Sequence, residues 1–137
     1  FPAGRLDKDT EGFLLLTNDG PLAHKLLAPG RHVNKTYLAV IEHRLTREEI
    51  DRLKGGVEIG EKKPARAAAI EVINETRILL TLQEGKFHQV KRMLQAVDNH
   101  VLALKRVSFG GISLDENLRP GEYRELTKEE VKMLYDA

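Results

Sequence analysis

The order of strand and helix signals between residues 67 and 109 constrains the fold of this chain most strongly. Two apolar runs, 67–73 and 77–82, are separated by a short polar turn and are expected to pair as an antiparallel hairpin. A helix is then predicted at 87–97 and a strand at 101–109. The helix carries one apolar stripe, made of Val90, Met93, Leu94 and Val97. This order predicts an α+β fold with a mixed, largely antiparallel sheet and flanking helices rather than a βαβ repeat.

The remaining elements are predicted from alternation, capping residues and turns, with no internal repeat, linker or low-complexity segment. Residues 35–43 alternate as a strand with Tyr37, Ala39 and Ile41 on one face. The hairpin turn is expected at Asn74-Glu75. Two helices begin with a capping box of threonine and glutamate. The other expected elements are a strand at 14–17, a short helix at 21–27, a helix from Thr46 and Glu49 to Gly55-Gly56, a short strand after Pro120-Gly121 and a helix capped by Thr127 and Glu130.

Length and composition predict one globular domain that covers residues 1–137. Hydrophobic residues make up 41% of the chain and charged residues 31%, which is typical of a folded domain. No apolar run approaches the roughly 20 residues that cross a bilayer, so no transmembrane helix is expected. The sequence contains 0 cysteines, which excludes disulfides and thiolate metal sites. We expect a cytoplasmic protein, since a reducing compartment suits such a chain.

The net charge of +1 argues against a polycation that binds nucleic acid through bulk charge alone. The charges are nevertheless unevenly placed. Between residues 86 and 106 a single acid, Asp98, faces five cations, which are Lys86, Lys91, Arg92, Lys105 and Arg106. A basic segment on a domain with little net charge is typical of a protein that binds phosphate groups on one face.

The segment Gly4-Arg5-Leu6-Asp7-Lys8-Asp9-Thr10-Glu11-Gly12 is a charged loop that leads into the apolar run Phe13-Leu14-Leu15-Leu16. A carboxylate on a loop beside a rigid strand can be held in place and still reach a substrate. Asp7 taken alone would most often cap a turn or meet solvent. Asp9 suits an Asx-turn, or it forms with Asp7 a pair of carboxylates such as glycosidases hold about 5 to 9.5 Å apart.

Two further motifs contain residue types that bind nucleotides. In Lys35-Thr36-Tyr37, the tyrosine ring can pack in the core, stack on a base, or do both. The segment 84–94 reads Glu-Gly-Lys-Phe-His-Gln-Val-Lys-Arg-Met-Leu, and its Lys91 and Arg92 can lie on a solvated helix face or supply cations to a site. His88 has no second histidine at ligand spacing, so it is interpreted as a binding or structural residue and no metal site is expected.

These motifs, with the tail from Gly110 to Arg124, resemble the RsuA-type pseudouridine synthases in order and spacing over nearly the whole chain. The resemblance implies the pseudouridine synthase catalytic fold and the isomerisation of a uridine in RNA, without metal or other cofactor. By this resemblance Asp7 is the nucleophile and Tyr37 packs against the target uracil. Lys91, or as second choice Arg92, would pair with Asp7 and lower the pKa of that carboxylate by roughly 1 to 3 units.

The same resemblance implies RNA-binding roles for a second set of residues. Within the loop, Arg5 would support the flipped nucleotide, whereas Asp9 would shape the loop rather than react. The complete RNA-binding set is Arg5, Lys35, Lys86, His88, Gln89, Arg92 and Arg106. Asp98 departs from the family pattern, since it stands at a helix end where the family usually has glycine and a left-handed residue is often needed.

The motifs at residues 35–37, 88–93 and 121–126 are closest to the family branch that modifies small-subunit ribosomal RNA. The expected target is therefore a specific uridine of 16S ribosomal RNA, and the expected partner is that RNA or an assembly intermediate. The alternatives are a synthase for large-subunit ribosomal RNA, a non-catalytic RNA-binding module and an interaction-only domain. The family usually adds an S4-like RNA-binding domain and a first catalytic strand, which do not precede Phe1. We therefore expect a catalytic-domain fragment. It is expected to be a monomer and to have no membrane partner.

Overall fold

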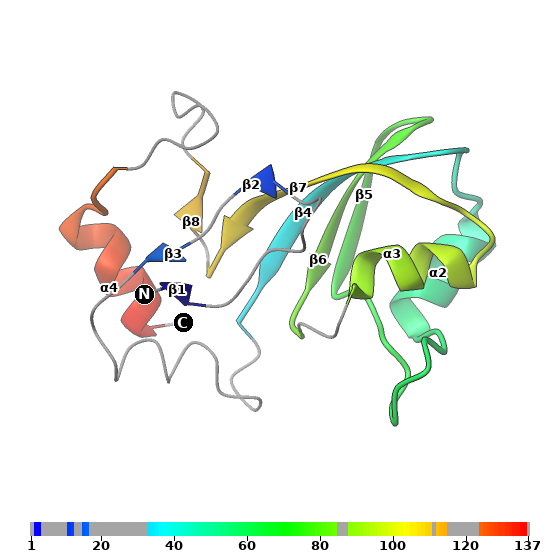
Figure 1. Cartoon of the computed structure of the whole chain (residues 1–137), viewed down its shortest axis with the longest axis horizontal. Coiled ribbons are helices and arrows are strands. Elements are labelled where there is room, and N and C mark those ends of the chain that lie inside the picture. The colour runs from blue at the N-terminus through cyan, green and yellow to red at the C-terminus, as the bar shows by residue number, and fades with distance from the viewer. Residues whose placement is uncertain are drawn as a thin grey trace.

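The computed structural model describes residues 2–3, 11–12, 15–16, 33–84, 88–110, 112–114 and 124–136 (Figure 1). The strands of the main sheet are β2 (Glu11–Gly12), β4 (Lys35–Ile41), β5 (Ala69–Asn74), β6 (Arg77–Leu82), β7 (Val101–Phe109) and β8 (Ile112–Ser113). They are arranged in the order β2-β7-β4-β6-β5, with β8 paired to β7. A second, two-stranded sheet pairs β1 (Pro2–Ala3) with β3 (Leu15–Leu16).

Strand pairing between the described strands of the main sheet is antiparallel except in one pair. Strand β4 lies between β6 and β7 and is antiparallel to both, and β5 and β8 extend the sheet with antiparallel pairs. Among the described strands, only β2 runs parallel to its neighbour, which is β7. The expected α+β fold with a mixed, largely antiparallel sheet is thus confirmed within the described residues.

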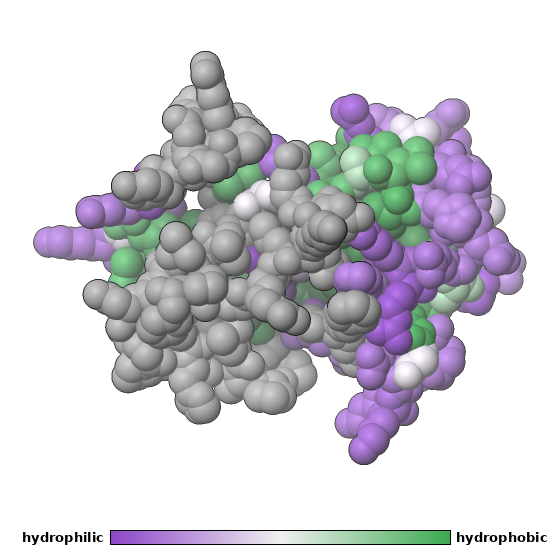
Figure 2. Space-filling model, viewed as in Figure 1, coloured by the Kyte–Doolittle hydropathy of each residue, from purple (hydrophilic) through white to green (hydrophobic). Residues whose placement is uncertain are grey.

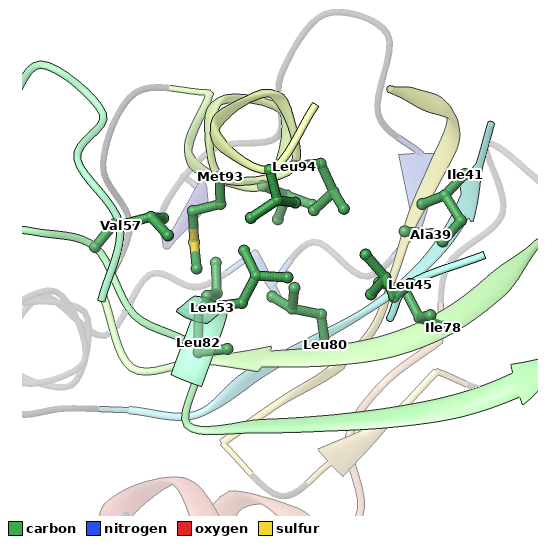
Figure 3. Packing of buried hydrophobic residues seen from close by; sticks show 14 of the residues in the cluster. Ala39, Ile41, Leu45, Leu53, Val57, Ile78, Leu80, Leu82, Met93 and Leu94 are labelled. Atoms are coloured by element: carbon green, nitrogen blue, oxygen red, sulfur yellow. The ribbon is translucent and has the colours of Figure 1, made fainter. Parts of the chain in front are cut away.

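Two helices cover one face of this sheet, and a hydrophobic core fills the space between them (Figure 3). They are α2 (Arg47–Gly55) and α3 (Gln89–Ala96). Leu53 of α2 and Met93 of α3 lie against Leu80 and Leu82 of β6. The predicted stripe of α3 is buried at all its positions, so its 3.6-residue period identified the core face correctly.

A second, smaller core lies where β7 and β8 meet α4 (Lys128–Asp136). It contains Val33, Phe109, Ile112 and Leu134, all buried. Because Phe109 is the last residue of β7, this core fixes the far end of the strand. None of the helices in the described residues is long and apolar enough to cross a membrane.

Both predicted capping boxes are present. The Thr46 hydroxyl accepts from the backbone N–H of Glu49, and the Glu49 carboxylate accepts from the backbone of Thr46. The same reciprocal bonds join Thr127 and Glu130 at the start of α4. Hydrogen bonds from Arg124 and from the Thr127 backbone lower the pKa of Glu130 to about 2. The end of α2 lies at Gly55 as expected, with Gly56 at φ 121°.

Several predicted boundaries differ from the structure by a few residues. Strand 35–43 ends at Ile41, strand 67–73 lies at Ala69–Asn74, and helix 87–97 is shorter at Gln89–Ala96. The hairpin turn lies at residues 75 and 76, one residue later than expected, because the Asn74 side chain accepts the N–H of Thr76 and holds the turn there. The helix expected at 21–27 lies outside the described residues, and residues 124–127 contain no strand.

Asp98 adopts the left-handed conformation at the end of α3, with φ 59°. The N–H of Asp98 bonds to the carbonyl of Gln95, and the N–H of Asn99 bonds to that of Leu94. These two bonds form a Schellman motif, in which the left-handed position favours glycine. The requirement for a left-handed residue at this helix end is therefore confirmed.

Asp98→Gly is expected to stabilise the protein by about 0.5 to 1 kcal/mol, because glycine adopts this conformation without Cβ strain. The free energy of unfolding in urea measures the effect. Asp98→Ala serves as the control, since it removes the same carboxylate and keeps the Cβ. If the alanine variant is as stable as the glycine variant, the left-handed conformation is not the cause.

Candidate active site

The charged segment 4–12, predicted to be a loop, ends in strand β2, which pairs with β7 of the main sheet. Glu11 pairs with Lys105 of β7 and Gly12 pairs with Arg106. Three predicted site residues lie outside the described part of the chain: Arg5, Asp7 and Lys86. The described end of the loop thus lies beside Arg106, another of the predicted site residues.

Gly12 allows an unusually close approach of the loop backbone to β7. Its φ is 114°, a conformation that residues with a Cβ rarely adopt. A Cβ built on Gly12 would overlap the carbonyl oxygen of Arg106 and lie 2.6 Å from its backbone nitrogen. The glycine is therefore required both by its conformation and by the space available.

Tyr37 of β4 lies on the face of the sheet that the helices cover. It pairs with Leu80 of β6 on one side and with Arg106 of β7 on the other. Residues directly opposite each other in an antiparallel pair share a face, so these three side chains lie together. The half-buried tyrosine packs against the hydrophobic core. Its predicted contact with the target uracil stays a prediction.

Arg106 and Lys35 place two cations around one aromatic ring. The guanidinium carbon of Arg106 lies 5.3 Å from the centroid of the Phe109 ring, and the Nζ atom of Lys35 lies 5.9 Å from it. A bulge between Thr36 and Tyr37 shifts the register of β4 on β7 and puts Phe109 opposite Lys35. The bulge therefore brings Lys35, Arg106 and Phe109 together.

Burial shapes the electrostatics of this cluster. Arg106 is only 2% exposed. Burial lowers the pKa of Lys35, and the neighbouring charge of Arg106 lowers it further. Positive charge concentrated here favours a carboxylate or phosphate nearby. Because Arg106 can reach an RNA phosphate only if the surrounding chain moves, its predicted RNA contact stays a prediction, and its observed role is within the protein.

The start of α3 holds two more predicted site residues. His88 precedes the helix in the left-handed conformation, with φ 46° and ψ 40°, and its side chain does not cap the helix. Gln89 is buried, and its side-chain amide donates to Glu84 at 2.9 Å and to the sulfur of Met93 at 3.6 Å. Gln89 therefore orients the start of the helix from inside the protein, and its RNA contact also stays a prediction.

Lys91 and Arg92, the two candidate cations of α3, have different surroundings. Arg92 donates from Nη1 to the carboxylate of Glu61 at 3.1 Å and from Nη2 to the carbonyl oxygen of Ile59. Lys91 is half-buried on the preceding position of the helix. The contacts of Arg92 hold its guanidinium at the loop before β5. The pairing of Lys91 with Asp7 stays a prediction, because Asp7 lies outside the described residues.

Three residues without a predicted individual role take part in this arrangement. Gly12 fixes the loop end on β7, Glu84 holds Gln89, and Phe109 carries the two cations. A glycine at the junction of a charged loop and a strand is a usable signal for close backbone approach. The position of the Phe109 ring depends on the bulge between β4 and β7. The alternation of residues along a single strand does not reveal such a bulge.

The arrangement brings the end of the charged loop, a tyrosine and two cations, one of them buried, to neighbouring strands, which suits chemistry on an anionic, aromatic substrate such as a nucleotide. The family model of RNA pseudouridylate synthases matches residues 1–96. The chain belongs to this family. The predicted resemblance to RsuA-type synthases is thereby confirmed, together with the expected fold class.

Relatives and a solved structure agree with this membership. The chain is 58% identical, over 98% of its length, to a Bacillus subtilis protein named an uncharacterized RNA pseudouridine synthase. It is 47% identical, over 94% of its length, to the Escherichia coli protein named ribosomal small subunit pseudouridine synthase A. A crystal structure of a pseudouridylate synthase superposes with a TM-score of 0.94 at 41% identity and covers 97% of the chain. The chain spans 58%, 56% and 58% of these three proteins.

Proposed function

We propose that the intact protein isomerises a specific uridine of small-subunit ribosomal RNA to pseudouridine, with Asp7 as the nucleophile. The observation that carries the proposal is the position of Arg106 between Gly12 and Tyr37 on neighbouring strands. Two strand spacings separate the loop end from the tyrosine strand, a distance of roughly 10 Å. The loop that bears Asp7 therefore ends within reach of a base stacked on Tyr37.

The proposed reaction breaks the bond between N1 of uracil and C1′ of ribose and forms a bond between C5 and C1′. Asp7 either adds to the ribose or the uracil ring, or assists elimination to a glycal. The detached uracil turns within the closed site, C5 bonds to C1′ and loses its proton, and N1 gains a proton. The overall step is an isomerisation, so electrons and atoms balance without an oxidant or reductant.

Asp7 must be ionised to act in this way. A cation within a few ångströms favours the ionised carboxylate. Lys91 is assigned this pairing ahead of Arg92, because the Arg92 guanidinium bonds to Glu61 and Ile59. The target uridine must also leave its stack in folded RNA, at a cost of a few kcal/mol. Stacking on Tyr37 and phosphate contacts offset that cost.

The small-subunit assignment rests on the motif blocks and on the name of the Escherichia coli relative, a ribosomal small subunit synthase. A large-subunit synthase and a non-catalytic RNA-binding module are the competing assignments. The experiment is pseudouridine mapping in ribosomal RNA from cells with and without the intact protein. Loss of one pseudouridine from small-subunit RNA is expected. Loss of a pseudouridine from large-subunit RNA alone would overturn the substrate assignment. No loss at any position would overturn the proposed activity.

A further inference from the structure

We propose that residues 57–65, the lysine loop, bind the sugar–phosphate backbone of the substrate RNA outside the site of the reacting uridine. The proposal rests on the proposed function, because it names a second contact with the same RNA. The loop has three relevant properties, which are a closed base, a tether to α3 and a basic, exposed tip.

The base of the lysine loop is closed by a pair of backbone hydrogen bonds. Val57 donates to the carbonyl of Ala65 at 2.8 Å, and Ala65 donates back to Val57 at 2.9 Å. Both side chains are buried in the main core. Pro64 lies against Gly56, where an added Cβ would come within 3.3 Å of its ring. The backbone of the loop is thus pre-formed, so little backbone conformational entropy remains to be lost on binding RNA.

Arg92 tethers the middle of the lysine loop to α3. Its guanidinium binds the carbonyl of Ile59 and the carboxylate of Glu61. Gly60 between them has φ 87°, and a Cβ there would lie 3.2 Å from Nη2 of Arg92. Since Lys91 is the neighbour of Arg92 on α3, the loop is held by the helix that carries the proposed partner of Asp7.

The exposed charge around the loop is mainly positive. Glu61 accepts from Arg92. Glu84, which follows β6, accepts from Gln89 and from the backbone N–H of Arg66, the residue directly after the loop. Between residues 54 and 66 one carboxylate, that of Glu58, and four cations are exposed. The cations are Lys54, Lys62, Lys63 and Arg66. The exposed side chains of this segment therefore carry a net positive charge, which suits phosphate.

The position and composition of the tip favour phosphate over bases. The loop projects beyond α2 and α3 in Figure 1, and its surface is hydrophilic in Figure 2. Residues 57–65 contain no aromatic side chain on which a base can stack. Lysine is a point charge that contacts phosphate without reading sequence. We infer that Lys62 and Lys63 add affinity and orientation but no base specificity.

The test compares Lys62→Glu/Lys63→Glu with Lys128→Glu/Lys132→Glu in the intact protein. The control pair is exposed on α4 and changes the net charge equally. The measurements are Kd for transcribed small-subunit ribosomal RNA over a range of salt, and kcat and KM for pseudouridine formation. The loop variant is expected to raise Kd and KM about tenfold, with kcat unchanged, and to reduce the salt slope of log Kd by about 2.

A loop variant that matches the α4 control in Kd and in salt slope would show that the lysines do not contact the RNA, and would overturn the proposal. RNA binding is measured independently of turnover, so an inactive wild-type protein would overturn the proposed function alone. Glu61→Ala and Glu61→Gln remove the same charge, but only glutamine keeps an acceptor for Arg92. Weaker RNA binding by the alanine variant is expected, and equal binding by the two variants would overturn the role of the tether.

Discussion

Asp7→Asn is expected to reduce pseudouridine formation by about 10⁴-fold or more while leaving the fold unchanged. Asparagine has the shape of aspartate but carries no negative charge, so its amide cannot act as the nucleophile. The two side chains have nearly the same size, so the substitution removes no apolar group and adds no volume. Release of tritium from RNA that contains 5-tritiated uridine measures the reaction directly, because C5 loses its hydrogen when the carbon–carbon bond forms.

The matched control is Asp9→Asn, which makes the same chemical change two residues along the loop. If Asp9 only shapes the loop, its variant keeps turnover within about tenfold of the wild type, whereas an equal loss would indicate a pair of carboxylates acting together. Thermal unfolding of each variant establishes that the fold is intact. Wild-type turnover by Asp7→Asn would end the proposal that Asp7 is the nucleophile.

Gly12→Ala is expected to destabilise the protein by about 3 kcal/mol and to reduce kcat by at least about 100-fold. The new Cβ would overlap the carbonyl oxygen of Arg106, so β2 could not keep its present distance from β7. The φ of 114° adds backbone strain for any residue with a Cβ. Since β2 holds the end of the loop that bears Asp7, its displacement is expected to misplace the nucleophile.

Gly55→Ala is a suitable control for this substitution. A Cβ at Gly55 would meet no atom within 4 Å, and the residue ends helix α2, far along the chain from the site. Alanine is also the better helix former, so a neutral or slightly stabilising effect is expected there. Urea unfolding and single-turnover kinetics separate loss of stability from loss of chemistry. A Gly12→Ala variant that is as stable and active as the control would contradict the required close approach.

The clearest sequence signals were those generated within a few neighbouring residues. The capping box at Thr46 and the strand bounds 77–82 and 101–109 agree with the structure. Each of these depends on caps, turns and periodicity, which act between residues close together in the chain. Asp98 followed the same rule, since a left-handed position at a helix end is a local requirement.

Predictions that depend on partners distant in the chain were less complete. A basic residue such as Arg92 looks like a ligand for RNA in the sequence, but its guanidinium bonds to Ile59 and Glu61, more than 30 residues away. Arg106 is likewise predicted to bind RNA, but the structure places it buried in the sheet. A cation's sequence neighbours do not reveal which carboxylate or carbonyl it will meet once the chain is folded.

The sequence by itself determined the long strands β4 to β7, the helices α2, α3 and α4, the buried face of α3 and the family to which the chain belongs. Only the tertiary structure decided that Arg106 lies between Gly12 and Tyr37, that a bulge sets Phe109 opposite Lys35, and that Arg92 serves the lysine loop. The physical reason is the range of the interactions. Periodicity and capping are local, whereas strand register, close backbone approach and the pairing of buried charges depend on which distant segments the core brings together.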